Sequence, residues 1–394
     1  MTQTVVVAGV GMVPFHKPGA SKPYHEMGAE AARLALADAG IAYDAVQQVY
    51  AGYVYGDSTS GQRAIYDVGM SGVPIVNVNN NCSSGSTALF LARQAVEAGV
   101  VDCALAVGFE QMQPGALGEV WRDRPSALGR FNELADEMVG ETQIPLTLRF
   151  FGGAGREYME RYDAPLDLFA EVRAKASRHA SANPLALFRK VVSAEDVLAS
   201  QVIWPGVLTR LMACPPTCGG AAAIVVSEAY ARRHGLRTDV RIKAQAMTTD
   251  RAGTFANRSM IDLVGAEMAR DAATAVYTRA GVDPKDIDVC ELHDCFAQNE
   301  VFTYEALGFC PEGGAAKFVD DGDNTYGGQV VTNPSGGLLS KGHPLGATGL
   351  AQCYELTHQL RGTADARQVD GAKLALQHNL GLGGAAVVTL YEKH

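Results

Sequence analysis

Residues 75–86 read IVNVNNNCSSGS, and the alanine-rich stretch Thr87–Ala98 follows directly. Ile75–Asn81 predicts a buried strand, whereas the apolar residues of Thr87–Ala98 recur at helical spacing and predict a helix. Cys82 therefore falls where a strand turns into a helix. Because another short apolar run, Cys103–Gly108, comes next, the order of strand, helix and strand indicates parallel α/β layers.

The same alternation extends along most of the chain. In the first part, the pattern predicts strands at Val5–Gly9 and Val46–Val54 and a helix at Met27–Ala39. In the last part, the predicted elements are strands at Ala221–Ser227, Ile287–His293, Val330–Thr332, Lys373–Leu376 and Ala385–Leu390 and helices at Val264–Ala280 and Ala347–Arg361. Both parts place reactive side chains at strand ends. This order of elements suggests a repeated fold, although the two parts share no evident sequence identity.

A segment between about residues 114 and 216 interrupts the alternation. It is richer in charged and aromatic residues, and helical periodicity occurs at Asp167–Ala182 and Ser193–Ser200. We therefore expect an α/β protein with three parts. These are a first half at 1–113 that is completed by 217–260, an inserted loop domain at 114–216, and a second half at 261–394.

The composition excludes several classes of protein. Hydrophobic residues make up 47% and charged residues 19%, as in ordinary globular enzymes. The net charge of −10, without a basic block, argues against nucleic-acid binding. No apolar stretch reaches the ~18 residues of a membrane span. The 8 cysteines do not resemble a disulfide framework, so a reducing cytoplasm is expected. Cys214 and Cys218 lack a second ligand pair, which favours two inert buried thiols over a zinc site.

Four segments carry residues that could take part in catalysis, and the Cys82 turn is the first. There the helix dipole and free backbone N–H groups would favour a thiolate and could bind an oxyanion. A buried structural cysteine would give the same pattern. The second segment, at residues 291–296, reads ELHDCF and places His293 and Cys295 where open α/β sheets bind ligands. A structural His–Asp turn is the alternative there.

The third segment, at residues 333–346, reads NPSGGLLSKGHPLG. Gly342 would let a substrate approach His343, and Pro344 would fix the turn. A neutral histidine can accept a proton from a thiol or donate to an oxyanion. The fourth segment, at residues 377–384, reads QHNLGLGG and could offer backbone N–H donors. Taken alone, it is better explained as a glycine-rich connection with a structural His378.

Taken together, the four segments resemble the catalytic loops of the thiolase family, in the same chain order. The quoted residues are Cys82-Ser-Ser84, His293-Asp-Cys-Phe296, Gly342-His-Pro344 and His378-Asn-Leu-Gly381. The second and fourth differ from the ordinary thiolase and match the sterol-carrier-protein X type. The resemblance runs nearly end to end and includes residues 56–59, 62–66, 77–82, 303–308, 322–328 and 376–379. It implies a five-layered αβαβα fold made of two similar halves plus an inserted loop domain.

The resemblance also implies a reaction. The chain would cleave a 3-oxoacyl-CoA with CoA into acetyl-CoA or propionyl-CoA and a shortened acyl-CoA, as in fatty-acid β-oxidation. Cys82 resembles the nucleophile that carries the acyl group, and His343 the residue that activates it. His293 stands where the ordinary family has Asn and would join His343 in a first oxyanion hole. Cys295 would be the second acid/base, because the ordinary family keeps that group in the fourth loop, where this chain has His378.

The second oxyanion hole would combine the Cys82 backbone N–H with one from Leu380–Gly381. Coenzyme A is then a co-substrate, and neither a permanently bound cofactor nor a metal is required. A homodimer or homotetramer is expected. The contacts with CoA stay unassigned, because the basic residues of the loop domain are expected to be solvated surface charges. These residues are Arg149, Lys175, Arg178 and Arg189.

Two other functions fit parts of the sequence. A condensing enzyme would use a Cys-His-His or Cys-His-Asn set, which the Cys295 segment argues against. A thiolase-like aldolase or scaffold that acts with a small partner protein would have lost its nucleophile, which Cys82, Cys295 and His343 together argue against. Eukaryotic members of the X type continue into a lipid-transfer domain beyond the aligned segment, so lipid transfer is not implied. The acyl chain that the protein accepts is not evident from its sequence.

Overall fold

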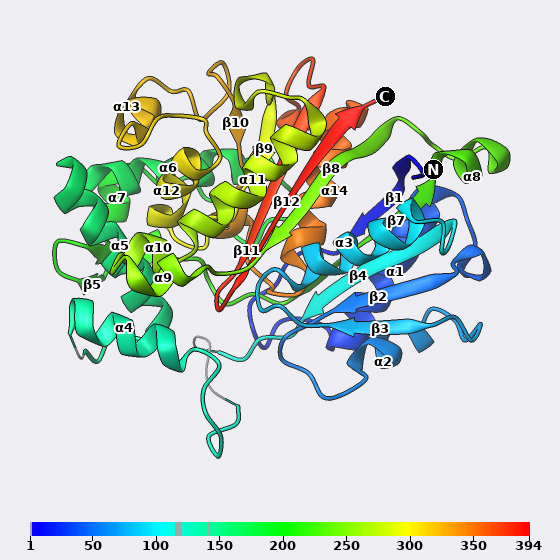
Figure 1. The fold of residues 1–394 in the computed structure, drawn as a ribbon, viewed down its shortest axis with the longest axis horizontal. Helices are drawn as coiled ribbons and strands as arrows, with labels where there is room; N and C mark the ends of the chain where they lie inside the picture. The colour runs from blue at the N-terminus through cyan, green and yellow to red at the C-terminus, as the bar shows by residue number, and fades with distance from the viewer. Residues whose placement is uncertain (1, 115–119, 141) are drawn as a thin grey trace.

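The computed structural model describes residues 2–114, 120–140 and 142–394. Its centre is a mixed sheet of ten strands in the order β10-β9-β11-β12-β8-β1-β7-β4-β2-β3. Helices cover both faces of this sheet (Figure 1). No helix among the described residues is long and apolar enough to cross a membrane.

The ten strands divide into two sets with the same arrangement. The first set is β1 (Val5–Met12), β2 (Gln48–Gly52), β3 (Ile75–Val78), β4 (Cys103–Glu110) and β7 (Gly219–Ser227). The second is β8 (Val240–Thr248), β9 (Val289–Glu291), β10 (Val331–Thr332), β11 (Leu374–Gly381) and β12 (Ala385–Lys393). In each set three parallel strands, β3-β2-β4 or β10-β9-β11, continue into two antiparallel ones. The pairing of Val6 with Arg241 joins the two sets. The two halves are therefore similar, as expected.

Helices form three layers around the two sets of strands. α3 (Ser84–Glu97) and α14 (Thr348–Arg361) pack against each other and against strands of both halves. α1 (Tyr24–Ala39) covers the first set from outside, and α11 (Ala266–Ala280) covers the second. Alternate side chains of the fully buried strand β1 enter different cores, one shared with α3 and α14 and the other with α1. The predicted five-layer αβαβα arrangement is thus confirmed.

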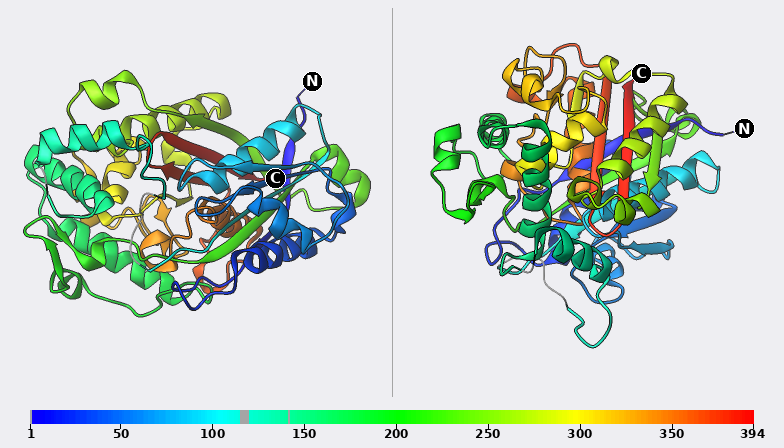
Figure 2. Two further views of the ribbon diagram at one scale, coloured as in Figure 1. Left: turned by 90° about the horizontal axis from the view of Figure 1, so that it is seen from below. Right: turned by 60° about the vertical axis from the view of Figure 1, so that its left-hand side comes forward.

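The inserted segment forms a helical body beside the second half, which Figures 1 and 2 show in green and cyan. Its elements are α4 (Gly129–Val139), α5 (Leu146–Tyr162), α6 (Asp167–Ser181), α7 (Ala194–Leu198), β5 (Val202–Trp204) and β6 (Leu208–Thr209). They share one hydrophobic core with α10 (Met260–Leu263) and α12 (Ala297–Ala306). Smaller elements are α2 (Ser60–Tyr66), α8 (Glu228–His234), α9 (Ala252–Ala256), α13 (Ala315–Asp320) and helical turns at Tyr43–Ala45, Arg210–Met212, Pro284–Asp286 and Asp365–Arg367.

A buried ion pair fastens the inserted segment to the second half. The ammonium of Lys175 on α6 pairs with the carboxylate of Glu300 on α12, and both side chains are at most 2% exposed. The Thr332 hydroxyl lies 2.5 Å from the same ammonium. The expectation that Lys175 is a solvated surface charge is therefore wrong. Arg149 is also buried and hydrogen-bonds Asn132, whereas Arg178 and Arg189 are exposed as expected.

Strand β8 lies inside the range 217–260 that the sequence assigns to the first half. It pairs along its length with β12 of the second half and at one position with β1. Sequence analysis did not identify β8, although Val240, Ile242 and Ala244 alternate with polar residues as a half-buried strand requires. We therefore propose that the second half begins near Val240 instead of at residue 261.

Candidate active site

Cys82 lies at the turn between β3 and α3, where the sequence places it. The turn is tight because Asn81 adopts φ 51, a left-handed conformation that asparagine tolerates better than most residues. The Asn81 N–H donates to the side-chain oxygen of Asn79 at 3.0 Å, and the Asn81 carbonyl accepts from the Ser84 hydroxyl at 2.6 Å. This run of asparagine and serine therefore holds the thiol at the N-terminal end of α3.

The Cys82 thiol is protonated at rest. Its residue is only 6% exposed, and burial raises the pKa of the thiol to about 12, with the Glu110 carboxylate acting in the same direction. The backbone N–H groups of Cys82 and Leu382 lower this pKa by less. The backbone N–H groups at this turn thus act in the expected direction, but desolvation outweighs them and opposes a resting thiolate. A base must therefore take the proton.

His343 is placed to be that base. It follows a π-helical turn at Gly337–Lys341, and Gly342 turns the chain with φ 115. The His343 N–H donates to the Thr217 hydroxyl at 3.0 Å, and Nδ1 of the ring lies 2.7 Å from the Thr348 hydroxyl. Burial lowers the pKa of His343 to about 3, so the ring is neutral at pH 7. Its Nε2 has no hydrogen-bond partner among the described residues.

His293 and Cys295 lie in the connection from β9 to α12. The His293 and His343 rings meet nearly at right angles, at 86°, with their centres 5.0 Å apart. The Cys82 sulfur and one ring nitrogen of each histidine all lie within 4.8 Å of one another. Burial lowers the pKa of His293 well below its usual value and raises that of the Cys295 thiol well above its usual value. The two thiols, of Cys82 and Cys295, and the two imidazole rings, of His293 and His343, are therefore uncharged at rest.

The fourth segment is mostly strand, not loop. β11 extends through Gly381 before the chain turns into β12. A Cβ at Gly381 would lie 2.2 Å from the Asn80 carbonyl oxygen, so only glycine fits beside the Cys82 turn. Leu380 lines the same cavity as Cys82, and the N–H of Leu382 reaches the Cys82 sulfur. The backbone donor next to the thiol is thus Leu382, one residue beyond the predicted pair.

His378 does not line that cavity. Its Nδ1 lies 3.5 Å from the backbone nitrogen of His293, which donates to it. Burial lowers the pKa of His378 to about 3. The structure therefore places His378 next to the His293 backbone, away from the thiol, as a strand residue that supports the segment carrying His293.

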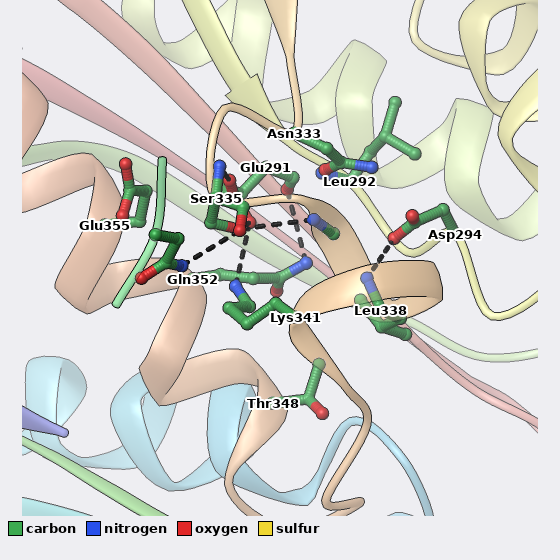
Figure 3. Close-up of polar contacts among 12 residues, drawn as sticks. Glu291, Leu292, Asp294, Asn333, Ser335, Leu338, Lys341, Thr348, Gln352 and Glu355 are labelled. Atoms are coloured by element: carbon green, nitrogen blue, oxygen red, sulfur yellow. Dashed lines mark hydrogen bonds and ion pairs between the residues drawn. The ribbon is translucent and has the colours of Figure 1, made fainter. Parts of the chain in front are cut away.

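Two buried carboxylates connect the second and third segments (Figure 3). Asp294 accepts a hydrogen bond from the N–H of Leu338, in the π-helical turn, at 2.6 Å. Glu291 accepts from the Ser335 hydroxyl at 2.7 Å and pairs with the Lys341 ammonium at 3.1 Å. The π-helical turn leads into His343. These contacts therefore hold His343 next to the segment at residues 291–296.

A cavity of about 710 Å³ opens beside Cys82. Cys295, Cys214 and both histidines line it, and the inserted segment supplies most of its apolar wall. That wall is formed by Leu148, Phe151, Phe188, Ile203 and Leu211. The Cys214 N–H donates to the Cys295 carbonyl at 2.9 Å. This hydrogen bond holds Cys214, the third cysteine at the cavity, against the segment at residues 291–296. Sequence reasoning expected Cys214 to be an inert buried thiol, and its place at this cavity was missed because the pairing between distant segments has no local signal.

Among the described residues, Cys82, His293 and His343 are the one group of Cys, His and acidic side chains spaced to hold a metal ion. An ion there would take the position of the proton that passes between the thiol and His343. The three side chains can thus serve a metal or the thiol chemistry, but not both at once.

Comparison with known proteins identifies the family. The family model described as "Thiolase, N-terminal domain" matches residues 5–197, and "Thiolase C-terminal domain-like" matches residues 251–392. The chain belongs to the thiolase family. It is 53% identical over 392 residues to human "Sterol carrier protein 2", covering 98% of this chain and 72% of that one. It is 32% identical to the acetyl-CoA acetyltransferase of Methanothermobacter thermautotrophicus, with 99% of both chains covered. The human match confirms the resemblance to the sterol-carrier-protein X type.

Two solved structures share this thiolase fold. The "Ltp2-ChsH2(DUF35) aldolase" has a TM-score of 0.82 at 22% identity, covering 98% of this chain and 97% of that one. Human mitochondrial 3-ketoacyl-CoA thiolase in complex with CoA has a TM-score of 0.71 at 18% identity, covering 100% and 98%. At these identities the likeness establishes the fold alone.

Proposed function

We propose that this thiolase is an acyltransferase that cleaves 3-oxoacyl-CoA with CoA, through an acyl group carried on Cys82. The products are acetyl-CoA, or propionyl-CoA, and a shortened acyl-CoA. The observation that carries the proposal is the Cys82 thiol, which lies within 4.8 Å of the facing nitrogens of His293 and His343 at one end of the apolar cavity.

In the first half-reaction, His343 Nε2 takes the proton of Cys82 and the thiolate attacks C3 of the substrate. The electron pair of the C2–C3 bond moves onto C2, and Cys295 protonates that carbon. While the charge is delocalised onto the thioester oxygen, the N–H groups of His293 and protonated His343 stabilise it. Acetyl-CoA leaves, and the shortened acyl chain stays on Cys82.

In the second half-reaction, the Cys295 thiolate removes the proton of an incoming CoA thiol. The CoA sulfur attacks the acyl carbon, Cys82 leaves as a thiolate, and His343 returns the proton to it. In this proposal the acyl oxygen accepts from the expected backbone N–H of Cys82 and from that of Leu382, which takes the place of the donor expected at Leu380–Gly381. CoA enters and leaves as a co-substrate, and the steps require no bound cofactor.

The cavity also suggests where CoA binds. Its apolar wall suits an acyl chain and the pantetheine arm, and the exposed Arg210 lies at the same cavity beside Ser200 and Gln201. A guanidinium can form bidentate hydrogen bonds with phosphate oxygens. We assign Arg210 to the phosphates of CoA, and Arg210→Ala is expected to raise the KM for CoA more than it changes kcat.

We further propose a homodimer built on the outer edge of β3. This strand ends the ten-strand order, so its outer edge has no neighbouring strand, although the Gln62 side chain reaches the Ile75 carbonyl at 3.5 Å. Tyr66, Met70 and Val76 near this edge are 50%, 78% and 40% exposed. Light scattering of wild type and Val76→Lys tests the proposal.

Because all eight cysteines are free, we place the protein in the reducing cytoplasm.

The test of the function is CoA-dependent loss of acetoacetyl-CoA and of longer 3-oxoacyl-CoA substrates. Cys82→Ala should reduce turnover by about 10⁴-fold or more, and Cys295→Ala by about 10²–10⁴-fold. Cys103→Ala is a matched control, because Cys103 is buried in β4 and does not line the cavity. If pure wild type were inactive on every chain length, the proposal would fail.

An aldolase that acts with a small partner protein is the second candidate, and a structure titled "Ltp2-ChsH2(DUF35) aldolase" shares the fold, with a TM-score of 0.82. Retro-aldol cleavage of a 3-hydroxyacyl-CoA does not need a nucleophilic thiol. Aldol cleavage that survives Cys82→Ala would therefore support this candidate against thiolysis.

A further inference from the structure

A chain of buried polar groups connects the side chain of His293 with the hairpin of β11 and β12. Nδ1 of His293 lies 3.0 Å from the side-chain amide of Asn379, whose other end lies 2.8 Å from the Ser86 hydroxyl. The Gln377 amide reaches both Ser86, at 2.8 Å, and the Gly349 carbonyl oxygen, at 2.7 Å. All these side chains are at most 2% exposed. The reaction steps above use none of them except His293.

The direction of each hydrogen bond follows from one acceptor. The Gly349 carbonyl can only accept, so the atom of Gln377 that faces it is the amide nitrogen. The same nitrogen also lies 2.8 Å from the Ser86 hydroxyl and 3.3 Å from the side-chain oxygen of Gln352, and its second proton is assigned to the shorter contact, with Ser86. The Ser86 hydroxyl proton is then left to donate to the oxygen of Asn379, at 2.8 Å. The Asn379 nitrogen therefore faces His293. Since it can only donate, Nδ1 of His293 must be unprotonated.

His343 has the opposite arrangement. The Thr348 hydroxyl lies 2.9 Å from the Pro344 carbonyl, which can only accept, so the hydroxyl proton is given to Pro344. The Thr348 oxygen then accepts from Nδ1 of His343. A neutral His343 consequently has its proton on Nδ1 and a free lone pair on Nε2, as a base for Cys82 requires.

We propose that Asn379, oriented by Ser86 and Gln377, is a positioning residue that fixes the proton of neutral His293 on Nε2. This assignment rests on the proposed function. The fixed tautomer gives His293 and His343 different roles before the substrate binds. His343 presents a lone pair to the thiol, and His293 presents an N–H to the thioester oxygen. If the proton of His293 were on Nδ1, the lone pair on its Nε2 would face the thioester oxygen and repel it.

Asn379→Asp tests this assignment, because it keeps the shape of the side chain and replaces the donor by an acceptor. The tautomer is read directly from the ring nitrogen chemical shifts in protein labelled with ¹⁵N-histidine, with His293→Asn to assign the signals. Wild type should show an unprotonated Nδ1 and a protonated Nε2 on His293, and Asn379→Asp should protonate Nδ1. A protonated Nδ1 on His293 in wild type would overturn the proposal, whatever the enzyme's activity.

Turnover gives an independent readout. Asn379→Asp should lower kcat by about 10²–10³-fold, the effect of losing one oxyanion donor, with little change in the KM for CoA. In a His293→Asn background, which supplies an amide donor that needs no tautomer, the same substitution should have less than a tenfold effect. Equal losses in both backgrounds, with an unchanged melting temperature, would contradict a role through His293. Inactive wild type with the expected shifts would instead contradict thiolysis alone.

Discussion

A Cβ added at Gly108 would lie 2.0 Å from the carbonyl oxygen of Gly346. Gly108 is on β4 of the first half, and Gly346 ends the His343 segment of the second. A Cβ at Gly85, at the start of α3, would also lie 2.5 Å from the same oxygen. The two halves thus meet backbone to backbone where Cys82 and His343 meet side chain to side chain, and glycine is the residue that allows this approach.

Gly108→Ala is therefore expected to separate the two halves of the site. The neighbour is backbone, so the added methyl group cannot be accommodated by a rotamer change. A loss of about 1–3 kcal/mol in the free energy of unfolding is expected, with at least a tenfold loss of thiolysis because the thiol moves away from His343. Urea denaturation and turnover check this. Gly129→Ala is the control, since a Cβ there has no neighbour within 4 Å, and it should change neither quantity.

The places of Cys82 and His343 in the fold were predictable from the sequence because they depend on local pattern. A strand that ends in Asn-Cys-Ser and a helix that follows it place Cys82 whatever the rest of the chain does. The same holds for His343 between Gly342 and Pro344.

The features that sequence analysis missed depend on pairing between distant segments. The contact of the Leu382 N–H with the thiol was missed because the register of the β11–β12 hairpin decides which N–H reaches it. Asn379 was quoted in the fourth segment without a role, because its function depends on Ser86. Lys175 was expected at the surface, since its burial follows only from Glu300 on another helix.

The Lys175–Glu300 pair gives a stability prediction. Lys175→Met should cost about 3–5 kcal/mol, because it leaves a buried carboxylate without its counter-charge. Combining it with Glu300→Gln should recover part of that loss, since the uncompensated charge is removed. Urea unfolding of the three proteins measures both effects. Lys317→Met is the matched control: Lys317 pairs with Asp321 one helical turn away on the surface, where it should have no measurable effect. Similar losses for the two lysine variants would contradict the buried-charge explanation.

The state of Cys82 gives a reactivity prediction. Because the pKa of the thiol is about 12 and that of His343 about 3, the resting pair is neutral. Alkylation of Cys82 by iodoacetamide should therefore accelerate steadily from pH 6 to pH 9, as the small thiolate fraction grows. Mass spectrometry of the Cys82 peptide measures this separately from Cys214 and Cys295. A rate that is constant over this range would show a preformed thiolate–imidazolium pair and contradict the neutral one.

Glu110 gives a prediction for stability against pH. Its carboxylate accepts the N–H groups of Val54, Tyr55 and Gly346 at 3.0–3.2 Å, and burial raises its pKa to about 7, from 4.5 in the unfolded chain. Between these values the folded protein binds the extra proton, so its stability falls as pH rises from about 4.5 to about 7. The fall attributable to Glu110 is about 3 kcal/mol.

Other groups titrate in the same window, so the quantity to measure is the difference in unfolding free energy between wild type and Glu110→Gln. The neutral amide cannot lose a proton, and the unfolding free energy of this variant should decline less between pH 5 and pH 7.5. Parallel curves for the two proteins would mean that Glu110 ionises in the folded state as easily as in water.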